Sequence, residues 1–154
     1  MDNALSRWVK DLLSTEGPNQ EFGIEAFPAT TLAACALLLE VTLSDHEENI
    51  DELKQMQHAM HESFAITPEV FDELLSASRR HLKQSVSLYE HTRVLNDALD
   101  HPSKIDLIGK MWQVAYADGH LDHYEEHLIR RVAELLYVEH RDFILAKLDA
   151  RDQA

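Results

Sequence analysis

A long apolar run, residues 29–44, most constrains how this chain can fold. Apart from Glu40, three threonines and Ser44, its residues are apolar. Pro28 precedes the run, and proline suits the first turn of a helix. The run is too short, and too interrupted by Glu40, to span a bilayer. A helix that is apolar nearly all round has to be enclosed by protein, so the sequence predicts a central, buried helix that ends near Asp45.

The rest of the chain has the spacing of amphipathic helices. Only 4 glycines and 4 prolines interrupt its 154 residues, which favours long helices with short connections over sheets that need many turns. Apolar residues at helical spacing predict helices over about 49–64, 67–83, 85–99, 103–117, 122–137 and 140–150. We therefore expect an all-α fold, with a single globular domain of seven to eight helices whose helical part covers residues 28–150.

An N-terminal segment, residues 1–27, precedes this helical domain. Residues 1–14 carry an apolar stripe at i, i+3, i+4, i+7 and i+8, made of Leu5, Trp8, Val9, Leu12 and Leu13. The break Gly17-Pro18-Asn19 then separates the stripe from a linker. The stripe predicts a short amphipathic helix whose apolar face docks on the core or on a partner.

The two halves of the chain resemble each other when Leu38 is aligned with Met111, an alignment we call the repeat register. Residues 38–45 then lie over residues 111–118, so that in both places an apolar helix ends in an aspartate. The same register lays Glu52 over Glu125. Each half therefore has the pattern of a buried helix, an acidic turn, an amphipathic helix and a further helix.

The repeat register slips by one residue near its end. It lays Phe64 over Tyr137, whereas Phe71 matches Phe143 only after the slip. We expect two similar helical halves, about 28–83 and 102–150, packed around a pseudo-twofold axis. Such an axis could bring the two acidic turns to one side of the molecule.

The charge of the chain disfavours several classes of function. Its net charge is -14, from 28 acidic and 14 basic residues, so it repels phosphate backbones and anionic membranes. We expect no nucleic-acid partner and no membrane insertion.

The single cysteine, Cys35, lies in the apolar run and is predicted to be a small buried residue. The first residues lack the basic start of a signal peptide, which favours a cytoplasmic location.

No motif in the sequence predicts catalysis. A Gly-rich phosphate loop, a nucleophile elbow and a Cys–His pair are all missing, so we expect no enzymatic activity. His123 and His127 are spaced i, i+4 near His120 and can hold Zn²⁺ together with a carboxylate. Exposed surface histidines are the favoured interpretation of this trio.

The acidic turns are the candidate site. Asp118, Asp122 and Glu125 fall at i, i+4 and i+7, and Asp45 and Glu52 repeat the i, i+7 pair in the first half. If the halves converge, these carboxylates can bind a divalent cation such as Ca²⁺, Mg²⁺, Mn²⁺ or Zn²⁺. The alternative is local structure, with Asp122 as an N-cap, Glu125 as its partner in a capping box, and Asp118-Gly119 as an ordinary turn.

The stretch from Ala117 to Glu125, Ala-Asp-Gly-His-Leu-Asp-His-Tyr-Glu, resembles the second motif of the tellurite-resistance TerB family. The stretch from Ser44 to Glu52 resembles the first motif in a degraded form, with His46 in place of the glycine. The resemblance implies an all-α fold of two similar halves and a bacterial cytoplasmic module of stress or tellurite resistance. It also implies a non-enzymatic role, in metal sensing or as a protein-interaction scaffold without a metal site. The partner would be another protein, and a second copy of this chain is one candidate.

Overall fold

The structure is a computed structural model that describes residues 27–43, 49–83 and 87–153. These ranges contain seven helices: α2 (Ala29–Leu43), α3 (Ile50–Phe64), α4 (Pro68–Lys83), α5 (Leu88–Ala98), α6 (His101–Ala115), α7 (His123–Leu135) and α8 (His140–Gln153). No strand occurs within the same ranges, so the predicted all-α fold is confirmed. The helix predicted within residues 1–14 lies outside the described residues.

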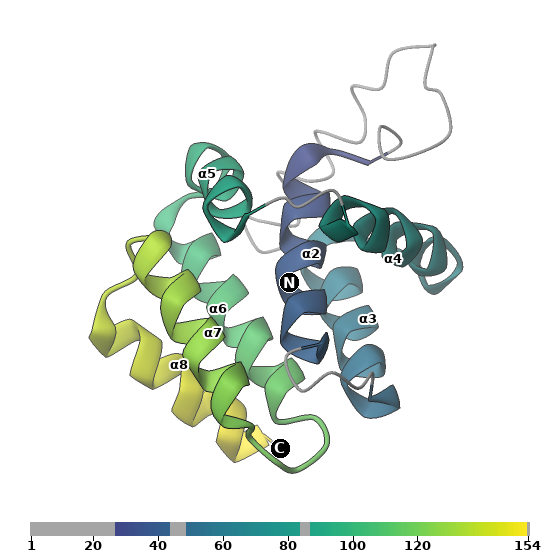
Figure 1. The fold of residues 1–154 in the computed structure, drawn as a ribbon. Helices are drawn as coiled ribbons and strands as arrows, with labels where there is room; N and C mark the ends of the chain where they lie inside the picture. Colours follow the sequence, from purple (N-terminus) through teal and green to yellow (C-terminus); the bar gives the residue numbers. More distant parts are fainter. Residues whose placement is uncertain (1–26, 44–48, 84–86, 154) are drawn as a thin grey trace.

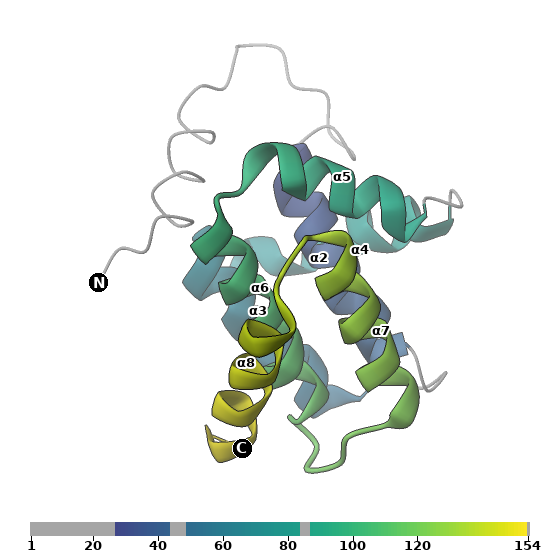
Figure 2. The same cartoon turned by 90° about the vertical axis from the view of Figure 1, so that its left-hand side faces the viewer.

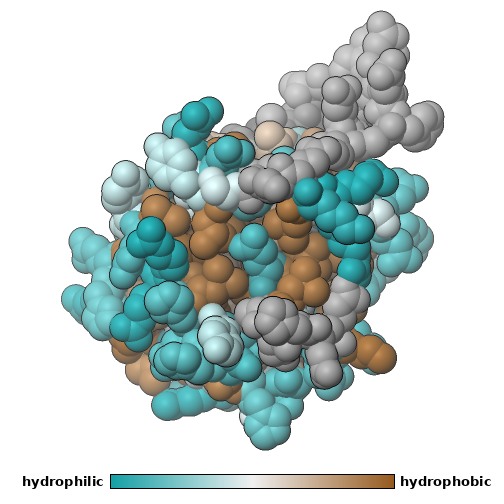
Figure 3. All heavy atoms as spheres, in the orientation of Figure 1, coloured by the Kyte–Doolittle hydropathy of each residue, from teal (hydrophilic) through white to brown (hydrophobic). Residues whose placement is uncertain are grey.

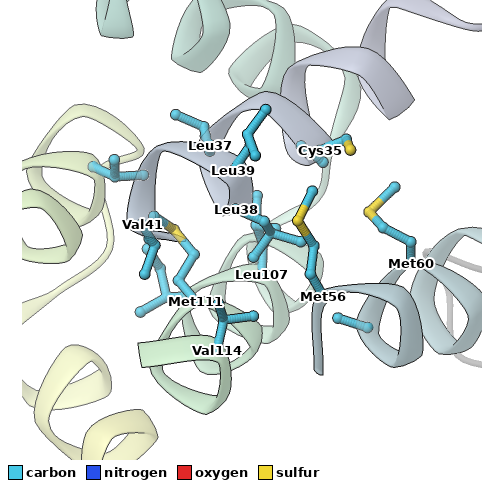
Figure 4. Close-up of a cluster of buried hydrophobic side chains, with 14 of the residues drawn as sticks. Cys35, Leu37, Leu38, Leu39, Val41, Met56, Met60, Leu107, Met111 and Val114 are labelled. Carbon is cyan, nitrogen blue, oxygen red and sulfur yellow. The ribbon is translucent and has the colours of Figure 1, made fainter. Parts of the chain in front are cut away.

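Helix α2 forms the centre of the fold, as its apolar sequence predicts. It contacts α3, α4, α5, α6 and α7, which surround it in the ribbon view (Figure 1). Every residue from Thr30 to Leu39 is buried. The side chain of Leu38 points toward Leu107 of α6, and Met56 approaches from α3 (Figure 4). Each such fully buried apolar side chain contributes about 1.5–3 kcal/mol of stability.

Short polar side chains fix where the helices begin. Four residues in extended conformation cap helix N-termini: Asn49, Ser87, Asp100 and Asp122. Each accepts a hydrogen bond from a backbone N–H of the first turn, a group that has no partner inside its own helix. The sequence therefore sets helix boundaries locally, while the apolar faces set how the helices pack.

The helices repeat in order and in contacts. In the repeat register, α2 overlaps α6 and α3 overlaps α7. In each half the first helix contacts the next two, α2 with α3 and α4, and α6 with α7 and α8. Between the halves, α3 contacts α6, and α7 contacts α2. The repeated pattern of contacts agrees with two similar halves, and the twofold axis between them stays a prediction.

One residue pairing taken from the repeat is wrong. Phe64 is fully buried at the end of α3, whereas Tyr137 is 77% exposed and cannot be its equivalent. Tyr137 corresponds instead to Ala65, because both follow the second helix of their half and have left-handed φ values of 60° and 56°. The one-residue slip therefore begins at the helix C-terminus, before the buried pair Phe71 and Phe143.

The structure also bears on two further expectations, the burial of Cys35 and the absence of a membrane-spanning helix among the described residues. Cys35 is fully buried, and burial raises the pKa of its thiol to about 12, which confirms that it packs as a small core residue. None of the described helices combines the length and apolarity that crossing a bilayer requires.

Candidate functional site

The segments that flank the predicted acidic turns lie at one end of the molecule. Helices α2 and α6 end there, and α3 and α7 begin there, as two views at right angles show (Figure 1 and Figure 2). We call this the acidic end and define it by Asp51, Glu52, Asp118, Asp122 and Glu125. The first acidic turn is described only at its borders, Leu43 at the end of α2 and Asn49 before α3. These borders lie at the same end of the molecule as the second turn, in agreement with the expectation that both turns lie on one side.

The turn after α6 is built by short local hydrogen bonds. The Gly119 N–H donates to the Tyr116 carbonyl at 3.0 Å, and the His120 N–H donates to Oδ1 of Asp118 at 2.9 Å. Gly119 has a φ of +84°, a conformation that costs glycine little and other residues more. Asp118 therefore stabilises the turn with one carboxylate oxygen, and Oδ2 takes no part in that bond.

The two helices that leave the acidic end are capped in the same way. Asp122 Oδ1 accepts the Tyr124 N–H at 2.7 Å, and Asn49 Oδ1 accepts the Asp51 N–H at 2.8 Å. Asp122 and Asn49 are equivalent in the repeat register. The prediction that Asp122 is an N-cap is confirmed, and the amide in the first half shows that capping needs no charge there.

A buried glutamate follows each cap at the third helical position. Glu52 in α3 and Glu125 in α7 are 0% and 1% exposed, and they occupy equivalent places in the two halves. A buried carboxylate is costly unless donors or cations surround it. Two such residues at matched positions distinguish these turns from ordinary exposed caps.

The predicted ligands come from different elements of the acidic end. Asp118 and Asp122 lie in the α6–α7 connection, Glu52 and Glu125 lie inside first turns, and Asp45 lies outside the described residues. Among the residues that the structure describes, no group of three or more His, Cys, Asp or Glu side chains is arranged to hold a metal ion. The nearby histidines are all exposed, in agreement with the favoured interpretation: His120, His123 and His127.

A groove beside the acidic end has no counterpart among the sequence predictions. It has a volume of about 810 Å³, lies between α3, α6 and α8, and is lined by residues that include Asp51 and Asp118. On its floor, Gln113 of α6 accepts a hydrogen bond from Gln55 of α3 at 3.3 Å and donates one to Gln153 of α8 at 3.4 Å. These amides join three helices across the groove.

An ion pair between a buried lysine and a half-exposed glutamate lies farther along the same groove. The Lys110 ammonium is almost fully buried and donates to Oε1 of Glu62 at 2.7 Å, while Nε2 of His58 lies 3.1 Å from Oε2. This hydrogen bond to Lys110 is the main cause that lowers the pKa of the Glu62 carboxyl. Close by, burial raises the pKa of Asp106, which accepts a hydrogen bond from Ser63 at 3.0 Å.

Sequence periodicity does not predict this ion pair. Lys110 stands among the apolar residues of α6, and Glu62 meets it in space only because α3 packs on α6. The one local signal is a lysine within an otherwise apolar stretch, since buried lysines are rare unless they are paired.

Comparison with known proteins supports the resemblance seen in the motifs. The family model described as "Tellurite resistance protein TerB" matches residues 31–148, which is most of the chain. Among curated proteins and among solved structures, none matches significantly. The matched range begins in α2 and ends in α8, so it contains both helical halves and both acidic turns. By its helical order, its motif at the α6–α7 turn and this match, the chain belongs to the TerB family of tellurite-resistance proteins.

Proposed function

We propose that this chain is a non-enzymatic module of bacterial stress or tellurite resistance that binds a divalent cation at its acidic end. One observation carries the proposal. Helices α3 and α7 begin at the same end of the molecule, and the first turn of each contains a buried glutamate, Glu52 or Glu125. Carboxylate oxygens are the ligands that Ca²⁺, Mg²⁺ and Mn²⁺ prefer.

In the proposed site, Asp118 and Asp122 supply further oxygens from the connection that precedes α7. Each uses Oδ1 to hold the backbone, which fixes the carboxylate in place without occupying Oδ2. A side chain that is already oriented loses less conformational entropy when it binds a ligand. The proposed cation site also includes Asp45, from the first half of the chain. We further propose that the protein is cytoplasmic.

Calorimetric titration with Ca²⁺, Mg²⁺, Mn²⁺ and Zn²⁺ tests the proposal. The useful variants are Asp118→Asn and Asp122→Asn, because asparagine keeps the Oδ1 acceptor of the turn and the cap while it removes the charge. Asp72→Asn, an exposed change on α4, is the matched control. We expect saturable heat with at least one ion, at least tenfold weaker binding in the two site variants, and no change in the control.

The second candidate function is a protein-interaction scaffold in which the acidic residues are only caps and turn formers. It is favoured by the hydrogen bonds that already engage Asp118 and Asp122. On this view no ion gives saturable heat, and neither metal nor chelator changes the melting temperature. A cation that binds only the folded state, at a free concentration 100 times its Kd, would instead add about 2.7 kcal/mol of stability.

A further inference from the structure

Two histidine side chains meet where α4 and α5 pack against α2, far from the acidic residues of the predicted site. His81 belongs to the last turn of α4, and His91 lies near the start of α5. Their ring centroids are 5.2 Å apart, and the ring planes are tilted by 49°. Both helices contact α2, one on either side of it in the ribbon view (Figure 1). We call His81 and His91 the histidine pair.

Each ring of the pair has a buried nitrogen atom without a hydrogen bond. His91 is 1% exposed, and its Nε2 has no hydrogen-bond partner among the described residues. The same is true of the buried Nδ1 of His81, so these two nitrogens are not joined to each other by a hydrogen bond. A buried polar atom without a partner is costly, and in a native fold it indicates a bound water molecule or ion. Two such atoms on adjoining rings are explained by a ligand that both rings share.

The charge state of the buried ring suits a metal cation. Burial first, and the neighbouring His81 second, lower the pKa of His91 to about 4, so this ring is neutral at pH 7. Neutral imidazole has a nitrogen lone pair and is the form that binds metal ions. A metal ion therefore does not have to displace a proton from His91 at neutral pH.

The separation of the two rings fits a shared ion. Zn²⁺ binds histidine nitrogens at about 2.0–2.1 Å with tetrahedral angles, which places the centroids of two coordinating rings roughly 5 Å apart. The observed distance of 5.2 Å agrees with this arrangement. His81 is only partly buried, and hydrophilic residues cover much of the outer surface over α4 and α5 (Figure 3). A hydrated ion can therefore approach the pair from the side of His81.

We propose that the histidine pair binds a divalent transition-metal ion of the Zn²⁺ type through His81 Nδ1 and His91 Nε2. Water completes the coordination, because no third His, Cys, Asp or Glu side chain is arranged with these two among the described residues. Imidazole ligands suit Zn²⁺, Cu²⁺ and Ni²⁺, whereas Ca²⁺ and Mg²⁺ prefer oxygen atoms. The pair is thus a second site, separate in place and in chemistry from the carboxylates of the acidic end.

Calorimetric titration of the full chain with Zn²⁺ at pH 7 tests this proposal. We expect saturable binding that His81→Gln and His91→Gln each weaken. Loss of a direct ligand should cost at least as much as loss of an outer-shell partner, about 10–100-fold in affinity. The control combines His123→Gln with His127→Gln, which removes two exposed histidines of α7 and should leave this binding unchanged. Asp118→Asn, which weakens the proposed site at the acidic end, should also leave it in place.

Nitrogen NMR of the histidine rings identifies the ligand atoms in the wild-type protein, so the test stands even if His91→Gln does not fold. Zn²⁺ should shift the resonances of His91 Nε2 and His81 Nδ1. Absence of saturable Zn²⁺ binding would overturn the proposal and leave water as the partner of these nitrogens. Binding that persists in His81→Gln but is lost in Asp118→Asn or in the control would place the ion elsewhere. Failure of Ca²⁺, Mg²⁺ and Mn²⁺ to bind would remove only the proposal for the acidic end.

Discussion

At the scale of single residues, the buried ammonium of Lys110 determines how the groove responds to pH. Lys110 holds the pKa of the half-exposed Glu62 carboxyl below its ordinary value of 4.5. A lowered pKa in the folded state means that the stabilisation is present above the pKa of the unfolded chain and is lost as pH falls through the folded pKa. The pair should therefore stabilise the protein at neutral pH and contribute nothing in strong acid.

We predict that Glu62→Gln lowers the free energy of unfolding by about 1 kcal/mol at pH 7, a value kept small because solvent screens the exposed carboxylate. The loss should disappear in strong acid, below the lowered pKa of Glu62, where the wild-type carboxyl is also neutral. Urea unfolding at both pH values measures this. Glu134→Gln removes an exposed partner of Arg131 and should have no effect at either pH. An equal loss at pH 7 and in strong acid would show that Glu62 acts through packing rather than charge.

At the scale of helices, the sequence predicts starts, faces and order well because those depend on local chemistry. The position of Asp122 before an apolar helix predicts its cap, and composition alone predicts the burial of α2. Helix ends are harder to place. The left-handed residues Ala65 and Tyr137 are not glycine, so no residue type marks them, and the repeat register is wrong by one residue there.

The candidate site is predictable only in part, because some of its features depend on how helices pack together rather than on local sequence. The spacing of Asp118, Asp122 and Glu125 is a local pattern that the sequence displays directly. The burial of Glu52 and Glu125 and the pairing of Lys110 with Glu62 depend on which helices pack together. Periodicity shows that a helix has a buried side, but it does not show which side chain of another helix comes to meet it.

The left-handed helix ends give a prediction for these elements. Ala65→Gly and Tyr137→Gly should each raise the free energy of unfolding by about 1 kcal/mol, because glycine adopts a positive φ without the steric penalty of a Cβ atom. Both midpoints are measurable by urea unfolding. Gly119→Ala is the reverse change: a Cβ would meet nothing within 4 Å, so strain at φ +84° alone should destabilise the protein. If Ala65→Gly and Tyr137→Gly both lowered the stability, other interactions of the Ala65 and Tyr137 side chains would outweigh the relief of backbone strain.

At the scale of the whole molecule, the two halves share one core. α2 from the first half contacts α6 and α7 from the second, and α3 contacts α6. Buried side chains such as Leu38, Met111 and Trp112 belong to a single continuous cluster. Neither half can bury its central helix alone, because the partner half covers one side of it. A repeat of this kind differs from a linear array, in which each unit contacts only its neighbours.

The protein should therefore unfold as one cooperative unit. We predict that urea removes the amide resonances of α3 and the indole resonance of Trp112 at the same concentration, although they belong to different halves. Leu38→Ala, a fully buried truncation in α2, should cost about 2–5 kcal/mol and lower both midpoints equally. An exposed truncation, Leu145→Ala on α8, should move neither by a comparable amount. If Leu38→Ala lowered the midpoint of α3 while Trp112 kept its own, the halves would be separate folding units, and the shared core would not couple them.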